Sequence, residues 1–288
     1  MSKVGLVMEG GAMRGMFTCG VIDVFMENGI EFDGAIGVSA GATFGCNYKS
    51  HQIGRPLRYN LRFCKDPRYG TFKSLRKYGD VYEKQFCYRD LPYKLDPMDF
   101  ATYESNPMEF YLVATEVESG RPMYTKIDHL DDKAMDWFQA GASMPIVSTP
   151  VEIDGKKYLD GGISDSIPLK AFEGMGFDHN VVILTQPLGY KKKKMSGFLL
   201  HLKAAKQYPN IQKRLSVRHQ IYNAEKEYVL SRRDEGACLL IAPEEKLPVS
   251  HMEHDPKKLR AAYDHGRKIG LAYLEQVKAF VGQYKSTK

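Results

Sequence analysis

The first fifty residues alternate short apolar strands with helices, and this alternation limits the possible folds more than any other feature. Residues 3–8 predict a buried strand, and from Phe17 onward apolar side chains recur at i, i+4, i+7 and i+8, on one helix face. Asn28-Gly29 ends that helix. Residues 32–38 predict a second strand and residues 42–48 a second helix. This order is typical of a parallel sheet covered by helices, so we predict an α/β fold.

The rest of the chain continues this pattern after a less regular stretch. Residues 54–106 are aromatic, polar and interrupted by prolines, which predicts loops and short helices covering one side of the sheet. Further elements are expected as strands at 110–115, 181–185 and 237–242, a hairpin of 151–153 and 157–159 around Asp154-Gly155, and helices at 134–142 and from Asp255-Pro256 onward. No repeat or linker interrupts the sequence, so we expect one domain over residues 1–288.

The segment Gly37-Val38-Ser39-Ala40-Gly41 matches GxSxG where the second predicted strand turns into a helix. A turn this sharp holds its central residue in a strained conformation that exposes the hydroxyl, and it requires tiny residues two positions away. The N-terminus of the following helix favours developing negative charge. Ser39 is therefore a candidate nucleophile, and the alternative is a simple turn of small residues.

Two further glycine-containing segments are candidate parts of the same site as Ser39. Residues 10–15 (GGAMRG) follow the first strand, and the backbone N–H groups of such a loop can bind a phosphate or an oxyanion. Ala12 departs from GxGxxG, and the Walker pattern is absent, so a nucleotide site is disfavoured. Asp160-Gly161-Gly162 follows the predicted hairpin and, taken alone, is typical of a turn.

Together, these three elements resemble the patatin-like phospholipase family over residues 4–185. A fourth family block, Ala-Ser-x-x-x-Pro, is present in shortened form as Ala142-Ser143-Met144-Pro145. The resemblance implies a three-layer α/β/α patatin-like fold with a mainly parallel central sheet. One departure is Ala12, where the family usually has a third glycine; an alanine keeps the N–H, so the oxyanion site survives if the local backbone suits a non-glycine residue.

The resemblance further implies a serine acyl-ester hydrolase that acts on phospholipid or acylglycerol esters through a Ser-Asp dyad. Ser39 would attack the ester carbonyl and Asp160 would act as the base, with no histidine between them. Burial should raise the pKa of Asp160, because an ordinary aspartate is a weak base at neutral pH. The remaining implied site residues are the oxyanion loop of Gly10, Gly11, Ala12 and Arg14, the turn glycines Gly37 and Gly41, and Gly161 and Gly162 beside the base.

Two alternatives remain open. The first is an α/β-hydrolase esterase with a Ser-Asp-His triad that uses His251, His254 or His265, in the expected chain order. Its weakness is that the serine turn comes at residue 39, too early for several preceding strands. The second is a non-catalytic lipid-binding protein of the same fold.

Positive charge is concentrated in one segment. The chain has a net charge of +6, and residues 190–233 hold twelve Lys and Arg against Glu225 and Glu227, a net +10. We expect this basic helical segment, which precedes the C-terminal strand and helix at 237–285, to be a solvated surface or a patch in peripheral contact with anionic membrane through residues 191–218. No nucleic-acid motif accompanies the charge, so nucleic acid is not an expected partner. Because the segment follows every catalytic motif, we expect it to take no part in the chemistry.

The location and redox state follow from composition. The longest apolar run, residues 237–242, has six residues, far short of the ~20 that span a membrane, and the N-terminus lacks an apolar signal core. We therefore expect a cytoplasmic protein with peripheral membrane contact. The five cysteines are scattered without metal-ligand spacing, so reduced thiols in or near the core, no metal and no cofactor are expected. No sequence feature specifies an oligomeric state.

Overall fold

The computed structural model describes residues 3–197 and 207–285, which build one eight-stranded sheet. The strand order is β5-β6-β3-β2-β1-β7-β8, and β4 pairs with β3 beside this path. The parallel strands are β1 (Val4–Met8), β2 (Gly34–Val38), β3 (Glu109–Glu116), β7 (His179–Ile183) and β8 (Cys238–Ile241). They confirm the predicted parallel sheet, and all five overlap the strands expected from the sequence.

The remaining three strands are antiparallel and form one end of the sheet. β5 (Val151–Ile153) and β6 (Lys156–Asp160) make the predicted hairpin, with Asp154 and Gly155 both at positive φ in its turn. β4 (Pro122–Lys126) was not predicted from the sequence, because it begins with a proline and is only partly buried, as a short edge strand is.

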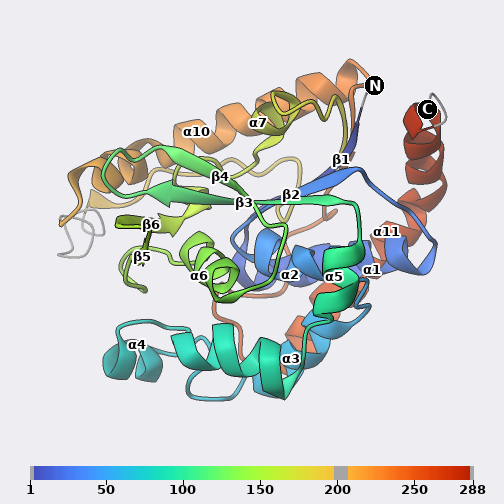
Figure 1. Cartoon of the computed structure of the whole chain (residues 1–288). Coiled ribbons are helices and arrows are strands. Elements are labelled where there is room, and N and C mark those ends of the chain that lie inside the picture. Colours follow the sequence, from blue (N-terminus) through green and yellow to red (C-terminus); the bar gives the residue numbers. More distant parts are fainter. Residues whose placement is uncertain (1–2, 198–206, 286–288) are drawn as a thin grey trace.

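Helices cover both faces of the sheet and complete the three-layer α/β/α arrangement (Figure 1). One face carries α1 (Gly15–Glu27), α2 (Ala40–Lys49), α6 (Asp132–Gly141) and α11 (Pro256–Lys285). The other face carries α7 (Leu169–Glu173) and α10 (Pro209–Asp234). Along β1, Leu6 packs in the core beneath α1, whereas Val7 packs in the core beneath α10, so both faces of the strand are buried.

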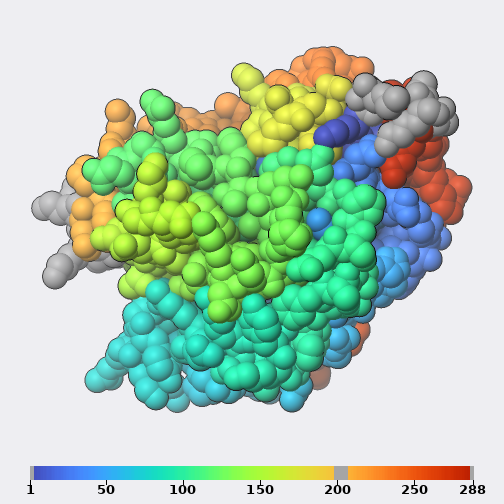
Figure 2. Space-filling view, in the orientation of Figure 1, coloured from blue at the N-terminus to red at the C-terminus, as the bar shows by residue number. Residues whose placement is uncertain are grey.

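The stretch predicted as loops and short helices forms a cap on the α2 side of the sheet. It contains α3 (Arg55–Phe63), α4 (Phe72–Tyr78), the π-helix η2 (Phe86–Leu95) and α5 (Phe100–Ser105). Figure 2 shows this part of the chain, in cyan and teal, as a continuous mass along the lower side of the molecule.

The described part of the basic segment is irregular at first and then helical. Residues 190–196 have no regular structure, and the helix α10 spans Pro209–Asp234, with a proline whose fixed φ suits the first helical turn. The expected apolar and basic residues Phe198, Leu199, Leu200, Leu202, Lys203 and Lys206 lie outside the described residues.

The cysteines and the helices were also expected to have particular properties. All five cysteines are free thiols in this structure, four of them buried and Cys87 partly buried, so they lie in or near the core as expected. Within residues 3–197 and 207–285, no helix combines the length and the apolar character needed to cross a membrane.

Candidate active site

Ser39 occupies the sharp turn between β2 and α2, as its flanking glycines predict. Its φ of 54° and ψ of −122° lie outside the regions that L-residues prefer, and it is the N-cap of α2. A Cβ on Gly37 would collide with the backbone of Gly41, and a Cβ on Gly41 would collide with the carbonyl of Met8. Only glycine fits at these two positions, and the tight turn that they allow holds Ser39 at the carboxyl end of the sheet.

Asp160 ends β6 and is almost completely buried. Its Oδ1 accepts a hydrogen bond from the Gly162 N–H at 2.7 Å, and its Oδ2 is a buried atom with no hydrogen-bond partner in the described part of the chain. Burial raises the pKa of Asp160, and the interaction with the Ser39 hydroxyl opposes that rise without cancelling it. A buried carboxylate with one free oxygen beside a serine hydroxyl is suited to accept a proton.

The glycine-rich loop between β1 and α1 lies directly against Ser39. A Cβ on Gly10 would come within 3.2 Å of the Ser39 Cβ, and one on Gly11 would collide with Thr185. Ala12 begins the 3₁₀ turn η1 (Ala12–Arg14) with a φ of 49°, in the left-handed region that favours glycine. The backbone at Ala12 therefore holds an alanine in a conformation that is costly for it.

Arg14 ends that turn and contacts a residue from far along the chain. Its Nη1 lies 2.9 Å from His251 Nε2. Because an arginine can only donate, this nitrogen of His251 must accept, so the ring carries its proton on Nδ1. Partial burial of the ring, followed by the charge of Arg14, lowers the pKa of His251 to about 4, which agrees with a neutral imidazole.

The histidines proposed for a triad do not reach Asp160 through any described hydrogen bond. His251 lines the same pocket as Ser39 but bonds to Arg14. His254 uses its Nδ1 on the carbonyl of Cys64, and His265 packs on the ring of Phe17. The described contacts therefore favour the dyad over the triad.

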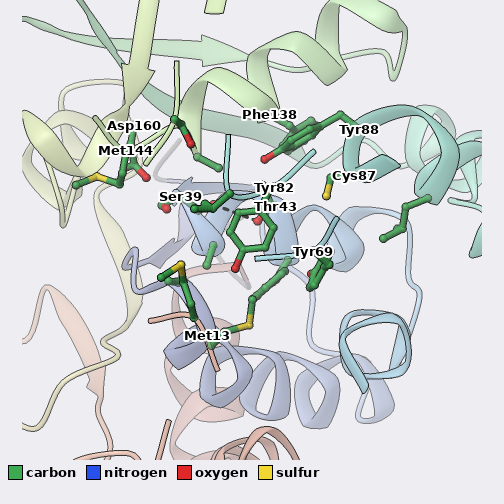
Figure 3. Close-up of a pocket in the computed structure, with 18 of the residues that line it drawn as sticks. Met13, Ser39, Thr43, Tyr69, Tyr82, Cys87, Tyr88, Phe138, Met144 and Asp160 are labelled. Carbon is green, nitrogen blue, oxygen red and sulfur yellow. Dashed lines mark hydrogen bonds between the residues drawn. The ribbon is translucent and has the colours of Figure 1, made fainter. Parts of the chain in front are cut away.

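Ser39 and Asp160 open onto a cavity of about 530 Å³. Figure 3 shows the two side chains at one end, with aromatic and sulfur-containing side chains extending away from them toward Phe138, Tyr88 and Tyr69. Much of the far wall comes from the cap, which contributes Tyr59, Tyr69, Tyr82, Cys87, Tyr88, Leu91, Pro92 and Met98. A long apolar cavity beside a serine and a buried carboxylate suits an acyl chain.

Parts of the basic segment lie next to the site, although the segment follows every catalytic motif in the sequence. Arg218 of α10 donates from Nε to the carbonyl of Gly162, next to the base. Lys192 lies over the ring of Tyr222, whose hydroxyl donates to the buried Glu9 at the start of the glycine-rich loop. Order along the chain did not reveal this, because α10 lies across one face of the sheet and its first turns lie beside Gly120 and Gly162 at the carboxyl edge (Figure 1). The only sequence signal was the excess of charge itself.

A model of the family described as patatin-like phospholipase matches residues 6–173, and a model for a domain of unknown function matches residues 208–282. The protein YjjU of Escherichia coli K12 is 31% identical over 200 residues, which cover 64% of this chain and 52% of YjjU. The NTE family protein Rv1063c of Mycobacterium tuberculosis H37Rv is 26% identical over 186 residues, 63% of this chain and 48% of the relative.

Two longer matches were also found. Lysophospholipase nte1 of Aspergillus terreus is 26% identical over 317 aligned residues, which cover 96% of this chain and 18% of the relative. The solved structure of VipD from Legionella pneumophila matches 96% of this chain and 67% of its own, with a TM-score of 0.47 and 13% identity. The chain thus spans about half the length of YjjU and of Rv1063c.

Proposed function

The chain belongs to the patatin-like phospholipase family, and from that premise we propose that it hydrolyses lipid acyl esters through a Ser39–Asp160 dyad. The observation that carries the proposal is the strained Ser39 beside the free, buried oxygen of Asp160, at one end of an apolar cavity. The acyl chain of a phospholipid or acylglycerol would lie along that cavity, with its ester carbonyl at Ser39.

The proposed first half-reaction forms an acyl-enzyme. Ser39 Oγ attacks the carbonyl carbon while its proton moves to Asp160 Oδ2, and the carbonyl oxygen becomes an oxyanion. Backbone N–H groups of Gly11 and Ala12, beside the Arg14 charge, would hold this oxyanion; donors of this kind are worth about 10²–10³ in rate each. When the intermediate collapses, the alcohol leaves with the proton that Asp160 had accepted.

The second half-reaction releases the fatty acid. A water gives its proton to Asp160 as its oxygen attacks the acyl carbon, and the Ser39–acyl bond breaks with return of the proton to Ser39. The raised pKa of Asp160 supports this double role, because a carboxylate with an ordinary pKa near ~3.9 would hold the proton too weakly.

A membrane contact is part of the proposal. Lys191, Lys193 and Lys194 are exposed beside Leu188, an apolar side chain that is 42% exposed. Cationic side chains around an exposed apolar one are typical of surfaces that touch anionic lipid. We propose that this loop contributes to peripheral contact through residues 191–218, as a cytoplasmic enzyme would make with an anionic leaflet.

The test of hydrolysis compares the wild type with Ser39→Ala on a panel of acyl esters and phospholipids. We expect Ser39→Ala to lose about 10³-fold or more in kcat/KM and to lose labelling by a fluorophosphonate probe. Ser105→Ala, a change of the same kind on the exposed surface of α5, is the matched control and should behave as the wild type. Equal labelling of Ser39→Ala would overturn the assignment, and a wild type that is neither labelled nor active would favour the non-catalytic alternative.

The same assay separates the dyad from the triad. Of the three histidines considered for a triad, His251 is the one that lines the pocket of Ser39, so in a triad His251→Ala would cost as much as Ser39→Ala. In the dyad His251 only contacts Arg14, and the loss should be far smaller than that of Ser39→Ala.

A further inference from the structure

Of four consecutive lysines, only one turns toward the active site. Lys191, Lys193 and Lys194 are exposed, whereas Lys192 is half-buried, with its Nζ 4.2 Å from the centre of the Tyr222 ring. The backbone at Lys192 is fixed on both sides by Asn223, whose side chain accepts from the Lys192 N–H at 2.9 Å and donates to its carbonyl at 3.1 Å. This inward position is therefore set by α10.

A second cation lies beside the base. Arg218 donates a hydrogen bond to the carbonyl of Gly162, and the N–H of Gly162 donates to Asp160. A Cβ on Gly162 would lie 3.2 Å from Arg218 Nη2 and 3.1 Å from Asp160 Oδ1, so the absence of a side chain there lets the guanidinium approach the carboxylate. Arg218 and then Lys192 act to lower the pKa of Asp160, although burial outweighs them.

The third cation, Arg14, contacts a residue of the cavity wall. It bonds to His251, which lines the cavity together with Ser39 and is exposed to solvent on its outer side. Partial burial, followed by the charge of Arg218, lowers the pKa of Lys192 to about 7, and Arg14 contributes in the same direction. Burial, and then Arg14, Lys192 and Arg218, lowers the pKa of His251. The contacts agree, because Arg14 bonds to His251, Arg218 bonds to Gly162, and Lys192 lies over the ring of Tyr222.

Across residues 3–197 and 207–285, none of these three cations forms a salt bridge with a carboxylate. Three acids face the group, and each is held by other donors. Glu9 accepts from the Thr185 N–H and the Tyr222 hydroxyl, Asp160 accepts from the Gly162 N–H, and Glu225 accepts from the N–H groups of Ser166 and Ile167. Crowded cations at a half-buried position repel one another, so an anion bound among them would be stabilised strongly.

We propose that Arg14, Lys192 and Arg218 form a subsite for a phosphate that lies next to the scissile ester of the substrate. The inference rests on the proposed hydrolysis and narrows its substrate class to lipid esters with an anionic phosphate headgroup. The geometry fits such a molecule, because the cavity beside Ser39 takes the acyl chain, while Arg14 contacts the cavity residue His251 and Arg218 contacts Gly162 next to Asp160. An uncharged acylglycerol would offer the three cations no direct ionic contact.

The test compares two esters that differ only in phosphate, 1-octanoyl-glycerol 3-phosphate and 1-octanoylglycerol. The wild type should have the higher kcat/KM on the phosphate-bearing ester. Lys192→Met should lower the ratio of the two kcat/KM values by about tenfold or more, mainly through KM, since it removes one charge-assisted contact to the phosphate. Lys193→Met removes the same charge from the exposed neighbour and should leave the ratio unchanged. A wild-type ratio near one, or an unchanged ratio in Lys192→Met, would overturn the subsite.

A binding measurement separates failure of the subsite from failure of the hydrolysis. Calorimetry on Ser39→Ala with sn-glycerol 3-phosphate needs no turnover, and added Lys192→Met should weaken that binding about tenfold. If the wild type hydrolyses neither ester but this binding is present and depends on Lys192, the hydrolysis fails and the phosphate site stands. Inorganic phosphate that binds as tightly as glycerol phosphate, without any preference among the esters, would point to a free-phosphate site and contradict the lipid headgroup.

Discussion

Asp160 combines two requirements that oppose each other. As a base it must be ionised, yet it is almost fully buried, and burial raises its pKa because the charged form loses hydration. A carboxyl whose pKa is higher in the folded protein than in the unfolded chain stabilises the fold fully only below the unfolded value of ~3.9. That contribution is lost as the pH rises through the folded value, so ionised Asp160 weakens the fold at neutral pH.

Asp160→Asn should therefore abolish activity and stabilise the protein. The amide keeps an oxygen for the Gly162 N–H, removes the buried charge and can donate to Ser39. We expect a loss of about 10³-fold or more in kcat/KM, with a Tm at pH 7 that is a few degrees higher. The gain in Tm should shrink as the pH falls toward 4, which thermal unfolding across that range would measure. A lower Tm at pH 7 would show that the ionised carboxylate stabilises the fold.

At the level of elements, the sequence predicted what depends on local pattern. The strand and helix on either side of Ser39 follow from apolar periodicity, and the hairpin before Asp160 follows from Asp154-Gly155. The site residues were placed through the resemblance of their motifs. Lys192 and Arg218 were missed because their positions depend on how α10 packs across the sheet and how Asn223 holds the loop, which no local pattern encodes.

The strained turns show the same limit of sequence reasoning. The pattern predicted strain at Ser39, and its positive φ agrees. For Ala12, the sequence left open whether the backbone would suit a side chain, and the left-handed φ shows that it does so only at a cost. The sequence shows that Ala12 stands where the family usually has glycine. It does not show the backbone conformation at Ala12, which depends on how the whole loop folds.

The helices α1 and α11 pack closely enough to test whether the chain is one domain, as we propose. They belong to the two separately matched regions, 6–173 and 208–282, and meet where a Cβ on Gly266 would collide with the Phe17 carbonyl. Gly266→Ala should separate the helices and lower stability by about 1–3 kcal/mol, because backbone must move to admit the methyl group. Thermal unfolding should remain one cooperative transition, followed equally by circular dichroism and by loss of ester hydrolysis.

Gly282 gives a matched control on the same helix. A Cβ there meets nothing within 4 Å, and the residue is exposed. Gly282→Ala should leave stability unchanged or raise it by up to about 1 kcal/mol, since alanine is the better helix former. Two separate transitions, with only one of them shifted by Gly266→Ala, would contradict the single domain.

For the whole molecule, the concentration of positive charge has two different consequences. One lysine of the run, Lys192, lies half-buried over the ring of Tyr222, and the three beside it are exposed to solvent. Because the inward and outward lysines share one loop, a surface attracted to the outward ones would meet the molecule where the headgroup subsite opens. Attachment and substrate entry would then take place on one face.

Neutralising the outward lysines alone tests this arrangement. Neutralising Lys191, Lys193 and Lys194 to Gln, with Lys192 kept, should weaken binding to anionic vesicles about a hundredfold, since each lysine near such a surface is worth about 1 kcal/mol. Co-sedimentation would measure this, and wild-type binding should fall as salt is raised. The same three changes at Lys268, Lys278 and Lys285 of α11 lower the net charge equally and should have little effect. If both triple variants bind alike, attraction depends on net charge, and the loop is not the attachment surface.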